Sequence, residues 1–261
     1  MAVQLTQTKF YQVNVQHSKK ATANLMQMTS TDKISKALIQ EPYQYQGKFA
    51  DITKGYRIFA CGEGKRRAAI IIQDNAIDAL LITQLLVNDA VLLEIINQNL
   101  SVYAASVYYN EPTDNIKTVE RILKFTKGGK LLLAIDSNSR STTWHDIKNN
   151  LRWKALEEFL SYNQLHIISE DSARTTFQSS RRSSNIDLTI ANNNMLAAIK
   201  DWELLEEQNC SDHNNKIQPE LQPRQSTQIQ LPRAEIYNKR EPTLRLSQKF
   251  SSTHFKAFSS M

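Results

Sequence analysis

Short apolar runs alternate with longer amphipathic segments along the chain, and most runs end in polar residues. Five apolar residues at 131–135, which follow Gly128, Gly129 and Lys130, predict a buried strand. Similar patterns predict strands at 10–15, 37–40, 56–60, 68–72, 91–96, 100–108, 165–168, 175–178 and 186–190. Apolar stripes at helical spacing predict helices over 17–28, 113–125 and 151–162. Helices inserted between groups of strands predict an α/β sandwich of mixed sheets.

Two connections between these strands have recognisable turn chemistry. The segment CGEGKRR joins strands 56–60 and 68–72, and it is rich in glycine and basic residues. Its GxG lacks a third glycine and a following helix start, so it is not a nucleotide-binding loop. Asn97-Gln98-Asn99 joins strands 91–96 and 100–108 and predicts a hairpin.

The composition divides the chain near residue 215. The 261 residues are 41% hydrophobic, which is enough for a substantial core. Beyond that point lie four of the six prolines and none of the six glycines, without a sustained apolar period. We therefore predict an extension over residues 1–8, a folded domain over 9–214 and a disordered tail over 215–261. The two cysteines, Cys61 and Cys210, lie far apart and support neither a disulfide framework nor a zinc site.

Charge and hydropathy limit the partners. The net charge is +6, but the tail holds eight basic and three acidic residues, so the folded part is close to neutral. Any attraction to phosphate must come from a local basic patch. No stretch approaches the roughly 18 apolar residues of a membrane span, and the N-terminus lacks a signal-peptide pattern. An intracellular protein that does not enter membranes is the expectation.

Polar side chains that suit metal or phosphate chemistry lie at the ends of predicted strands. They are Asn14, Glu41, Asp136 with Asn138, Asp187, and Asp212 with His213. Histidine titrates near neutral pH, and a neighbouring carboxylate fixes its tautomer. Carboxylate oxygens are ligands that Mg²⁺ accepts. Such a set suits attack of water on a phosphodiester, although the pattern around each residue taken singly favours a turn or cap residue.

The ordered motifs NVQHSKKAT, QEPY, AIDSNSRSTTWH, SNIDLT and SDH closely resemble the endonuclease domain of non-LTR retrotransposons. That family is a branch of the endonuclease/exonuclease/phosphatase superfamily, with apurinic/apyrimidinic endonucleases and DNase I. The resemblance covers about residues 9–214. It implies a DNase I-like, four-layer sandwich of two mixed β-sheets flanked by helices. It also implies nicking of double-stranded DNA with Mg²⁺, or Mn²⁺ in its place, in the nucleus, leaving a 3′-hydroxyl that primes a reverse transcriptase.

The resemblance assigns roles position by position. Asn14, Glu41 and Asp212 resemble the residues near the metal. Asp136 resembles the residue that activates or orients water, and Asn138 a donor to the phosphate oxygens. Tyr108 resembles the tyrosine on the scissile phosphate, with Tyr103 and Tyr109 as competing alignments. His213 resembles the histidine that stabilises the transition state, oriented by Asp187; whether His213 or Asp136 is the base stays open. Arg181 and Arg182 lie where the family has a hairpin that enters a DNA groove, although a solvated basic turn is an equal interpretation.

Three features depart from the family pattern. Trp153 stands where the family has glycine, and it predicts a local rearrangement. NNKIQPELQP, after His213, offers little alternation and contains two prolines where the family has a final strand, so we predict that this strand is missing. No reverse transcriptase follows, which suggests a truncated copy. Two alternatives therefore stand beside the endonuclease: an inactive nucleic-acid-binding remnant, and a phosphatase of the same fold.

Overall fold

The structure, a computed structural model, describes residues 8–31, 34–73, 77–85, 87–97, 100–109, 112–168, 174–199, 202–205, 210–214 and 216–221. All of them belong to one compact unit, Met1–Arg224. The predicted hairpin turn at residues 98–99 lies outside the described residues, as do residues 1–7 and 222–261 of the two predicted terminal segments. No helix among the described residues is long and apolar enough to cross a membrane.

The first six-stranded sheet has the order β15-β16-β1-β2-β6-β5. Its strands are β15 (Glu203–Leu204), β16 (Lys216–Leu221), β1 (Thr8–Asn14), β2 (Lys36–Gln40), β6 (Ala68–Ile72) and β5 (Arg57–Phe59). β1 runs parallel to β2, and the register pairs Asn14 with Gln40 at the shared end. β6 is antiparallel to both β2 and β5, as the sequence predicts for the segments flanking CGEGKRR.

The second six-stranded sheet has the order β11-β14-β10-β9-β8-β7. Its strands are β11 (Leu165–Ile167), β14 (Asp187–Asn192), β10 (Leu131–Asp136), β9 (Leu100–Tyr108), β8 (Ala90–Asn97) and β7 (Asp78–Leu81). The central strand β10 is buried along its whole length, runs parallel to β9 and is antiparallel to β14. Both sheets are therefore mixed.

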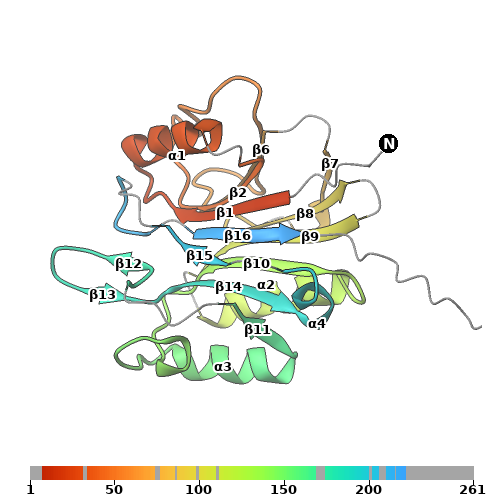
Figure 1. The fold of residues 1–261 in the computed structure, drawn as a ribbon, viewed down its shortest axis with the longest axis vertical. Coiled ribbons are helices and arrows are strands. Elements are labelled where there is room, and N and C mark those ends of the chain that lie inside the picture. Colours follow the sequence, from red (N-terminus) through yellow and green to blue (C-terminus); the bar gives the residue numbers. More distant parts are fainter. Residues whose placement is uncertain are drawn as a thin grey trace, which may run out of the picture. The chain divides into compact units, whose positions relative to one another are not determined.

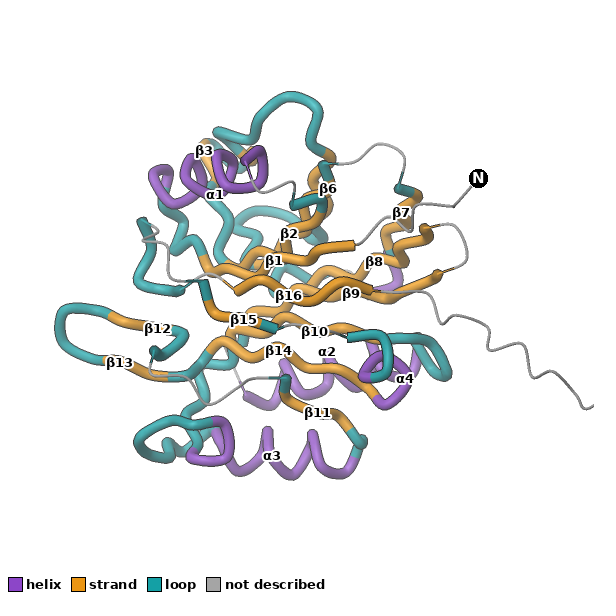
Figure 2. Tube along the Cα trace, viewed as in Figure 1, coloured by secondary structure: helices purple, strands orange, loops and turns teal. Residues whose placement is uncertain are grey.

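Helices cover the outer face of each sheet (Figure 1), and Figure 2 separates helices from strands by colour. α1 (Lys19–Thr31) covers the first sheet, and α2 (Pro112–Phe125) and α3 (Trp153–Tyr162) cover the second. The shorter elements are β3 (Gln44–Tyr45), β4 (Lys48–Phe49), η1 (Thr83–Leu85), η2 (Thr142–Trp144), β12 (Phe177–Gln178), β13 (Ser183–Ser184) and α4 (Asn193–Leu196).

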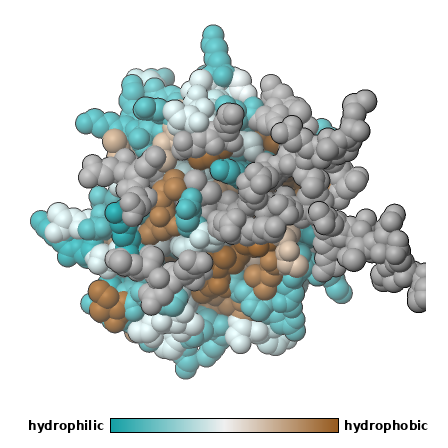
Figure 3. Space-filling view, in the orientation of Figure 1, coloured by the Kyte–Doolittle hydropathy of each residue, from teal (hydrophilic) through white to brown (hydrophobic). Residues whose placement is uncertain are grey.

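Three apolar clusters correspond to the three interfaces between these layers. The central cluster joins Leu38 and Ile70 of the first sheet to Leu93 and Leu132 of the second. One outer cluster packs α1 on the first sheet, and the other packs α2 and α3 on the second. The space-filling view shows apolar groups mainly over the strands in the middle of the view (Figure 3). The fold is thus the expected DNase I-like, four-layer α/β sandwich.

The predicted absence of a final strand is wrong, because β16 pairs antiparallel with β1 and with β15. Its internal Pro219 lies where the pairing with β1 shifts register, between Thr8 and Phe10. Proline lacks the N–H that a regular ladder needs, and a bulge is one place where a strand tolerates it. The sequence pattern is misleading here because a strand with weak alternation and an internal proline can still pair where a bulge accommodates the proline.

Two smaller differences concern helix starts. α1 begins at Lys19 and not at residue 17, because Gln16 and His17 have positive φ angles of 51° and 52°. Ser18 precedes the helix, and its hydroxyl accepts a hydrogen bond from the Ala21 N–H. Trp153, which stands in place of a glycine, begins α3, packs against the outer cluster and does not have a positive φ. The tryptophan therefore needs no glycine-like backbone.

Candidate active site

Three candidate residues lie side by side on adjacent strands of the second sheet. The register pairs Asp136, the last residue of β10, with Tyr108 on β9 and with Asp187 on β14. Residues directly opposite one another in neighbouring strands present their side chains on the same face. Positions 108, 136 and 187 are therefore held in one row by backbone pairing alone.

Asn14 connects this row to the first sheet. It is the last residue of β1 and is 1% exposed. Its Nδ2 donates to Asp136 Oδ2 at 2.7 Å and to Glu41 Oε2 at 3.1 Å. Its Oδ1 accepts the Gln16 N–H at 2.8 Å, which fixes the orientation of the amide. Asn14 thus links two carboxylates that come from different sheets.

Glu41 follows β2 directly and has a positive φ of 48°, a conformation that few non-glycine residues adopt. His17 Nε2 lies 3.4 Å from Glu41 Oε1, and the His17 Nδ1 lies 3.1 Å from the Pro42 carbonyl oxygen. Burial by itself would raise the pKa of Glu41, but hydrogen bonds with His17 and Asn14 outweigh it and hold the pKa below its ordinary value. Glu41 is therefore a carboxylate at neutral pH.

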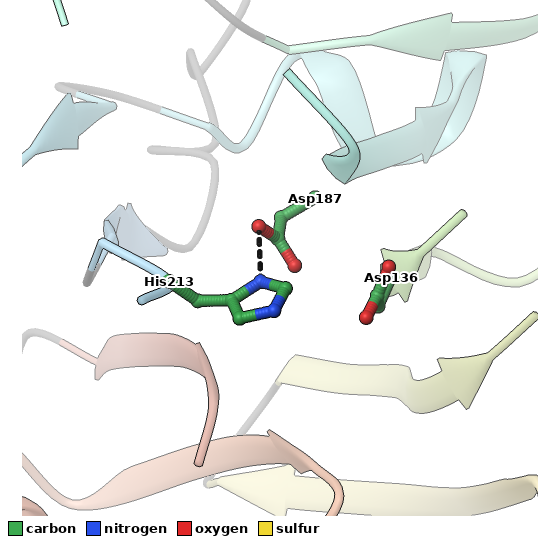
Figure 4. Close-up of side chains that lie close together, drawn as sticks. All are labelled: Asp136, Asp187 and His213. Atoms are coloured by element: carbon green, nitrogen blue, oxygen red, sulfur yellow. Dashed lines mark hydrogen bonds and ion pairs between the residues drawn. The ribbon is translucent and has the colours of Figure 1, made fainter. Parts of the chain in front are cut away.

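His213 and Asp187 form a buried pair, each 4% exposed. The His213 Nδ1 lies 2.8 Å from Asp187 Oδ2, and Asp136 lies on another side of the ring (Figure 4). The Phe177 ring meets the imidazole edge-on at 4.9 Å between centroids. The Ser211 hydroxyl accepts the His213 N–H and donates to the Asn14 carbonyl, so the loop that carries His213 is attached to β1.

Electrostatics place a positive imidazole among buried carboxylates. Burial opposes the charge on His213, but the charge and hydrogen bond of Asp187 outweigh it and raise the pKa to about 9. Burial and repulsion from Asp187 raise the pKa of Asp136 above its ordinary value. The carboxyl groups of Asp136 and Asp187 and the imidazole of His213 therefore share a site from which water is largely excluded.

Tyr108 is the one of the three competing tyrosines that faces this site. Burial, followed by the charges of Glu41 and Asp136, raises its pKa to about 12, so its hydroxyl keeps its proton at neutral pH. Tyr109 is 3% exposed in the outer cluster, and the Tyr103 ring packs edge-on against Phe125.

Asn138 lies just after β10 with a positive φ of 47°. Its backbone N–H donates to Asp136 Oδ1 at 3.2 Å, and its Nδ2 donates to the Tyr109 carbonyl at 3.1 Å. A side-chain hydrogen bond with Asn138 also moderates the raised pKa of Tyr108. The positive φ therefore directs the chain so that residue 138 stays beside residue 136.

The remaining candidates lie at the rim. Asp212 is exposed, and its N–H donates to Gln16 Oε1 at 3.0 Å. Arg181 and Arg182 are exposed in the turn between β12 and β13. The Arg182 guanidinium lies 5.1 Å from the centre of the Phe177 ring, the ring that also packs on His213.

Asp136, Asp187 and His213 have ligand atoms within 4.8 Å of one another, close enough for one metal ion. Of the predicted metal residues, Glu41 and Asn14 join this group through hydrogen bonds, whereas Asp212 lies apart at the rim. We call Asn14, Glu41, Asp136, Asp187 and His213 the polar cluster.

Sequence reasoning missed several residues that hold the polar cluster. His17 contacts Glu41, Gln16 contacts Asn14 and Asp212, and the Thr176 hydroxyl accepts the Asp187 N–H at 3.1 Å. Gln16 and His17 lie within NVQHSKKAT, and Ser211 lies within SDH. Their closeness in the sequence to Asn14 and His213 is the signal that could have identified them. Nothing in the sequence pattern singles out Thr176.

The sequence of this chain is similar to sequences of known proteins. Residues 102–217 match the family model described as endonuclease-reverse transcriptase. A putative 115 kDa protein of the type-1 retrotransposable element R1DM of Drosophila melanogaster is 24% identical over 217 residues, covering 78% of this chain. The chain spans only 21% of the length of that curated relative.

Solved structures share the fold. The endonuclease domain of TRAS1, a telomere-specific non-LTR retrotransposon, is 29% identical, with a TM-score of 0.73 over 82% of this chain and 98% of that domain. The AP endonuclease LMAP of Leishmania major is 11% identical, with a TM-score of 0.65 over 83% of this chain and 88% of that enzyme. The chain therefore has the endonuclease/exonuclease/phosphatase fold and is related to the endonuclease domains of non-LTR retrotransposons.

Proposed function

We propose that this chain is a Mg²⁺-dependent endonuclease that hydrolyses a phosphodiester bond in one strand of double-stranded DNA. The observation that carries the proposal is the convergence of the polar cluster: one amide joins Glu41 to Asp136, and Asp136 adjoins the His213–Asp187 pair. The similarity to the TRAS1 endonuclease domain supports the same reaction class.

The donor set fits a hard divalent cation. The raised pKa of Asp136 reflects buried negative charge beside Asp187, which a cation would relieve. Glu41 and Asp136 offer carboxylate oxygens, with Asn14 beside them and Asp212 at the rim for an ion or its water. When bound, Mg²⁺ supplies charge neutralisation for the phosphoryl oxygens. Mn²⁺ has the same ligand preference and should replace it.

The residues of the polar cluster then have separate tasks. Asp136 accepts a proton from the attacking water on a carboxylate oxygen. The water oxygen bonds to phosphorus, the P–O3′ bond breaks, and the departing 3′-oxygen takes up a proton from solvent, leaving a 5′-phosphate and a 3′-hydroxyl. His213, kept protonated by Asp187, stabilises negative charge on the phosphoryl oxygens. Tyr108 and Asn138 donate hydrogen bonds to those oxygens.

Arg181 and Arg182 lie in the turn of the β12–β13 hairpin, and the Arg182 guanidinium lies 5.1 Å from the centre of the Phe177 ring, which also packs on His213. We assign these arginines to phosphate or minor-groove contacts. In a retrotransposon, the 3′-hydroxyl would prime a reverse transcriptase, which is the partner we expect, and the site of action would be the nucleus.

Nicking of supercoiled plasmid tests the proposal. With Mg²⁺ we expect conversion to open circles that EDTA abolishes. His213→Ala and Asp187→Asn should each reduce the rate by about 10²–10⁴-fold, the usual cost of losing a positioned acid or base. The matched control is His166→Ala: His166 lies on β11 and contacts Asn193, away from the cluster, so the rate should not change.

The outcomes separate the alternatives. Loss of less than about twofold in His213→Ala contradicts the assigned role. Plasmid binding without nicking identifies the inactive remnant, and hydrolysis of a small phosphomonoester without nicking identifies a phosphatase. The main argument for the remnant was the missing final strand, and β16 removes it.

A further inference from the structure

The basic turn CGEGKRR has no role in the proposed reaction, yet its last residue adjoins the site. Arg67 directly precedes β6. Its carbonyl oxygen accepts the Glu41 N–H at 2.9 Å, and its own N–H donates to the Asn88 carbonyl at 2.7 Å. The Arg67 backbone is therefore fixed from two sides, one of which is the backbone of a predicted metal ligand.

The Arg67 side chain reaches across to the second sheet. Nε donates to Asp89 Oδ1 at 2.5 Å and Nη2 donates to Asp89 Oδ2 at 2.6 Å. Two parallel charge-assisted bonds of this kind define the guanidinium plane as well as its position. Asp89 lies directly before β8, so the ion pair joins the two sheets beside the polar cluster.

The same pair contacts Tyr108 twice. The Arg67 guanidinium carbon lies 5.3 Å from the centre of the Tyr108 ring, within the range of a cation–π interaction. The Asp89 carbonyl oxygen accepts the Tyr108 N–H at 2.8 Å. Arg67 thus contacts the ring of Tyr108, and Asp89 accepts a hydrogen bond from the backbone of the same tyrosine.

We propose that Arg67 and Asp89 are positioning residues that fix the Tyr108 hydroxyl relative to Glu41. The inference rests on the proposed function, because Tyr108 matters for the rate only if it contacts the scissile phosphate. Arg67 itself is not assigned to DNA, since Asp89 engages its Nε and Nη2. Its effect is exerted through the tyrosine.

A double-mutant cycle on nicking kinetics tests this coupling. Arg67→Ala should lower kcat on the order of 10- to 10²-fold with little change in KM, the cost of misplacing a reacting group by about 1 Å. In a Tyr108→Phe background, where the hydroxyl is gone, Arg67→Ala should cost little more. Arg67→Lys should not restore the rate, because an ammonium cannot make two parallel bonds to Asp89.

The neighbouring Arg66 supplies a matched control. Its guanidinium carbon also lies 5.3 Å from an aromatic ring centre, that of Phe49, but its Nε donates to the Gly62 carbonyl and not to Asp89. Arg66→Ala should leave kcat unchanged. An equal loss from Arg67→Ala in both backgrounds would overturn the inference, as would a loss confined to KM, which would mark Arg67 as a DNA contact.

A measurement without DNA keeps the inference separate from the proposed function. Fluorotyrosine placed at position 108 should give one sharp ¹⁹F resonance in the otherwise unaltered chain and in Arg66→Ala. Arg67→Ala and Asp89→Asn should shift or broaden it. If this resonance does not respond to Arg67→Ala, the positioning role is refuted whether or not the protein nicks DNA. If the resonance responds to Arg67→Ala but the unaltered chain does not nick DNA, only the proposed function fails.

Discussion

At the scale of single residues, the properties of the site arise from burial combined with one specific neighbour. His213 shows this most clearly, because its removal from water disfavours the imidazolium while Asp187, 2.8 Å away, favours it more strongly. The net result is a raised pKa, so the imidazole is charged at neutral pH. A histidine near a carboxylate in the sequence could not reveal this balance, since it depends on exposure and distance.

The titration of His213 predicts how stability changes with pH when EDTA removes metal. The folded-state pKa is about 9 and the ordinary value is 6.5, so His213 stabilises the fold fully below about pH 6.5. This contribution is lost as pH rises through 9. Asp136, whose pKa is raised from 3.8 to about 7, acts with the same sign at lower pH, and its contribution is lost as pH rises through about 7. We expect the unfolding free energy in urea to fall over this pH window.

Measuring the unfolding free energy against pH in two variants separates the contribution of His213 from that of other groups. Asp187→Asn removes the carboxylate charge that raises the His213 pKa, so its decline in stability from pH 6.5 to 9 should be shallower. His166→Ala, the distant control, should keep the slope of the unaltered chain. A parallel decline in Asp187→Asn would contradict the assignment.

At the scale of elements, two short segments decide whether the site is complete. β16 provides β1 with a neighbour on the side opposite β2. It lies only two residues after Asn214, so pairing of β16 also restrains the loop that carries His213. Without it, β1 would present an unpaired edge.

Proline substitutions in β16 test this role. Ile217 pairs with Tyr11 on β1 and with Glu203 on β15, so Ile217→Pro removes a backbone donor from a paired position. We expect a lower melting temperature and slower nicking. Pro219→Ala, at the register shift, is the control and should change neither; equal effects in both variants would refute the importance of the pairing.

The β12–β13 hairpin exposes two arginines in its turn. Arg181→Ala and Arg182→Ala should each weaken binding to duplex DNA, and each should reduce the slope of log affinity against log salt by about one. Lys154→Ala is the control, because Lys154 lies on α3 and is largely exposed. Unchanged salt slopes in both arginine variants would show that the hairpin does not contact DNA phosphates and is a solvated basic turn.

At the scale of the whole described unit, buried polar contacts set the alignment of the two sheets. Gln40 is 0% exposed, and its Nε2 donates to Ser106 Oγ at 2.9 Å and to the Ala134 carbonyl at 3.0 Å. On β1, Gln12 Oε1 accepts the Thr189 hydroxyl at 2.9 Å. Apolar packing between sheets is non-directional, whereas these bonds specify one alignment. That alignment brings Asn14 of one sheet to Asp136 of the other.

Replacing Gln40 should therefore affect both stability and activity. Gln40→Leu leaves buried partners unsatisfied, and we expect a loss of about 1–3 kcal/mol in unfolding free energy. Nicking should fall further than stability alone explains, because Asn14 and Asp136 lose their alignment. Gln27→Leu, at an exposed position of α1, is the control. Full activity in a folded Gln40→Leu would show that packing alone aligns the sheets.

Much of the fold and the list of site candidates could be obtained from the sequence. Apolar periodicity reflects which side of an element faces the core, so it located β10, the antiparallel pairing of β8 with β9, and the helices to within a few residues. The ordered motifs named each member of the polar cluster. β16 escaped because a bulge accommodates Pro219, and pairing with β1 depends on residues about two hundred positions away.

What the sequence alone determined was which side chains were available and which elements carried them, because local pattern and residue chemistry are properties of the chain itself. Only the tertiary structure decided which tyrosine faces the cluster, that Asp136 lies beside the His213–Asp187 pair, and that Arg67 bridges to Asp89 and Tyr108. Those outcomes depend on strand register, sheet alignment and burial. Each of these is a relation between distant segments, and it exists only once the two sheets have packed.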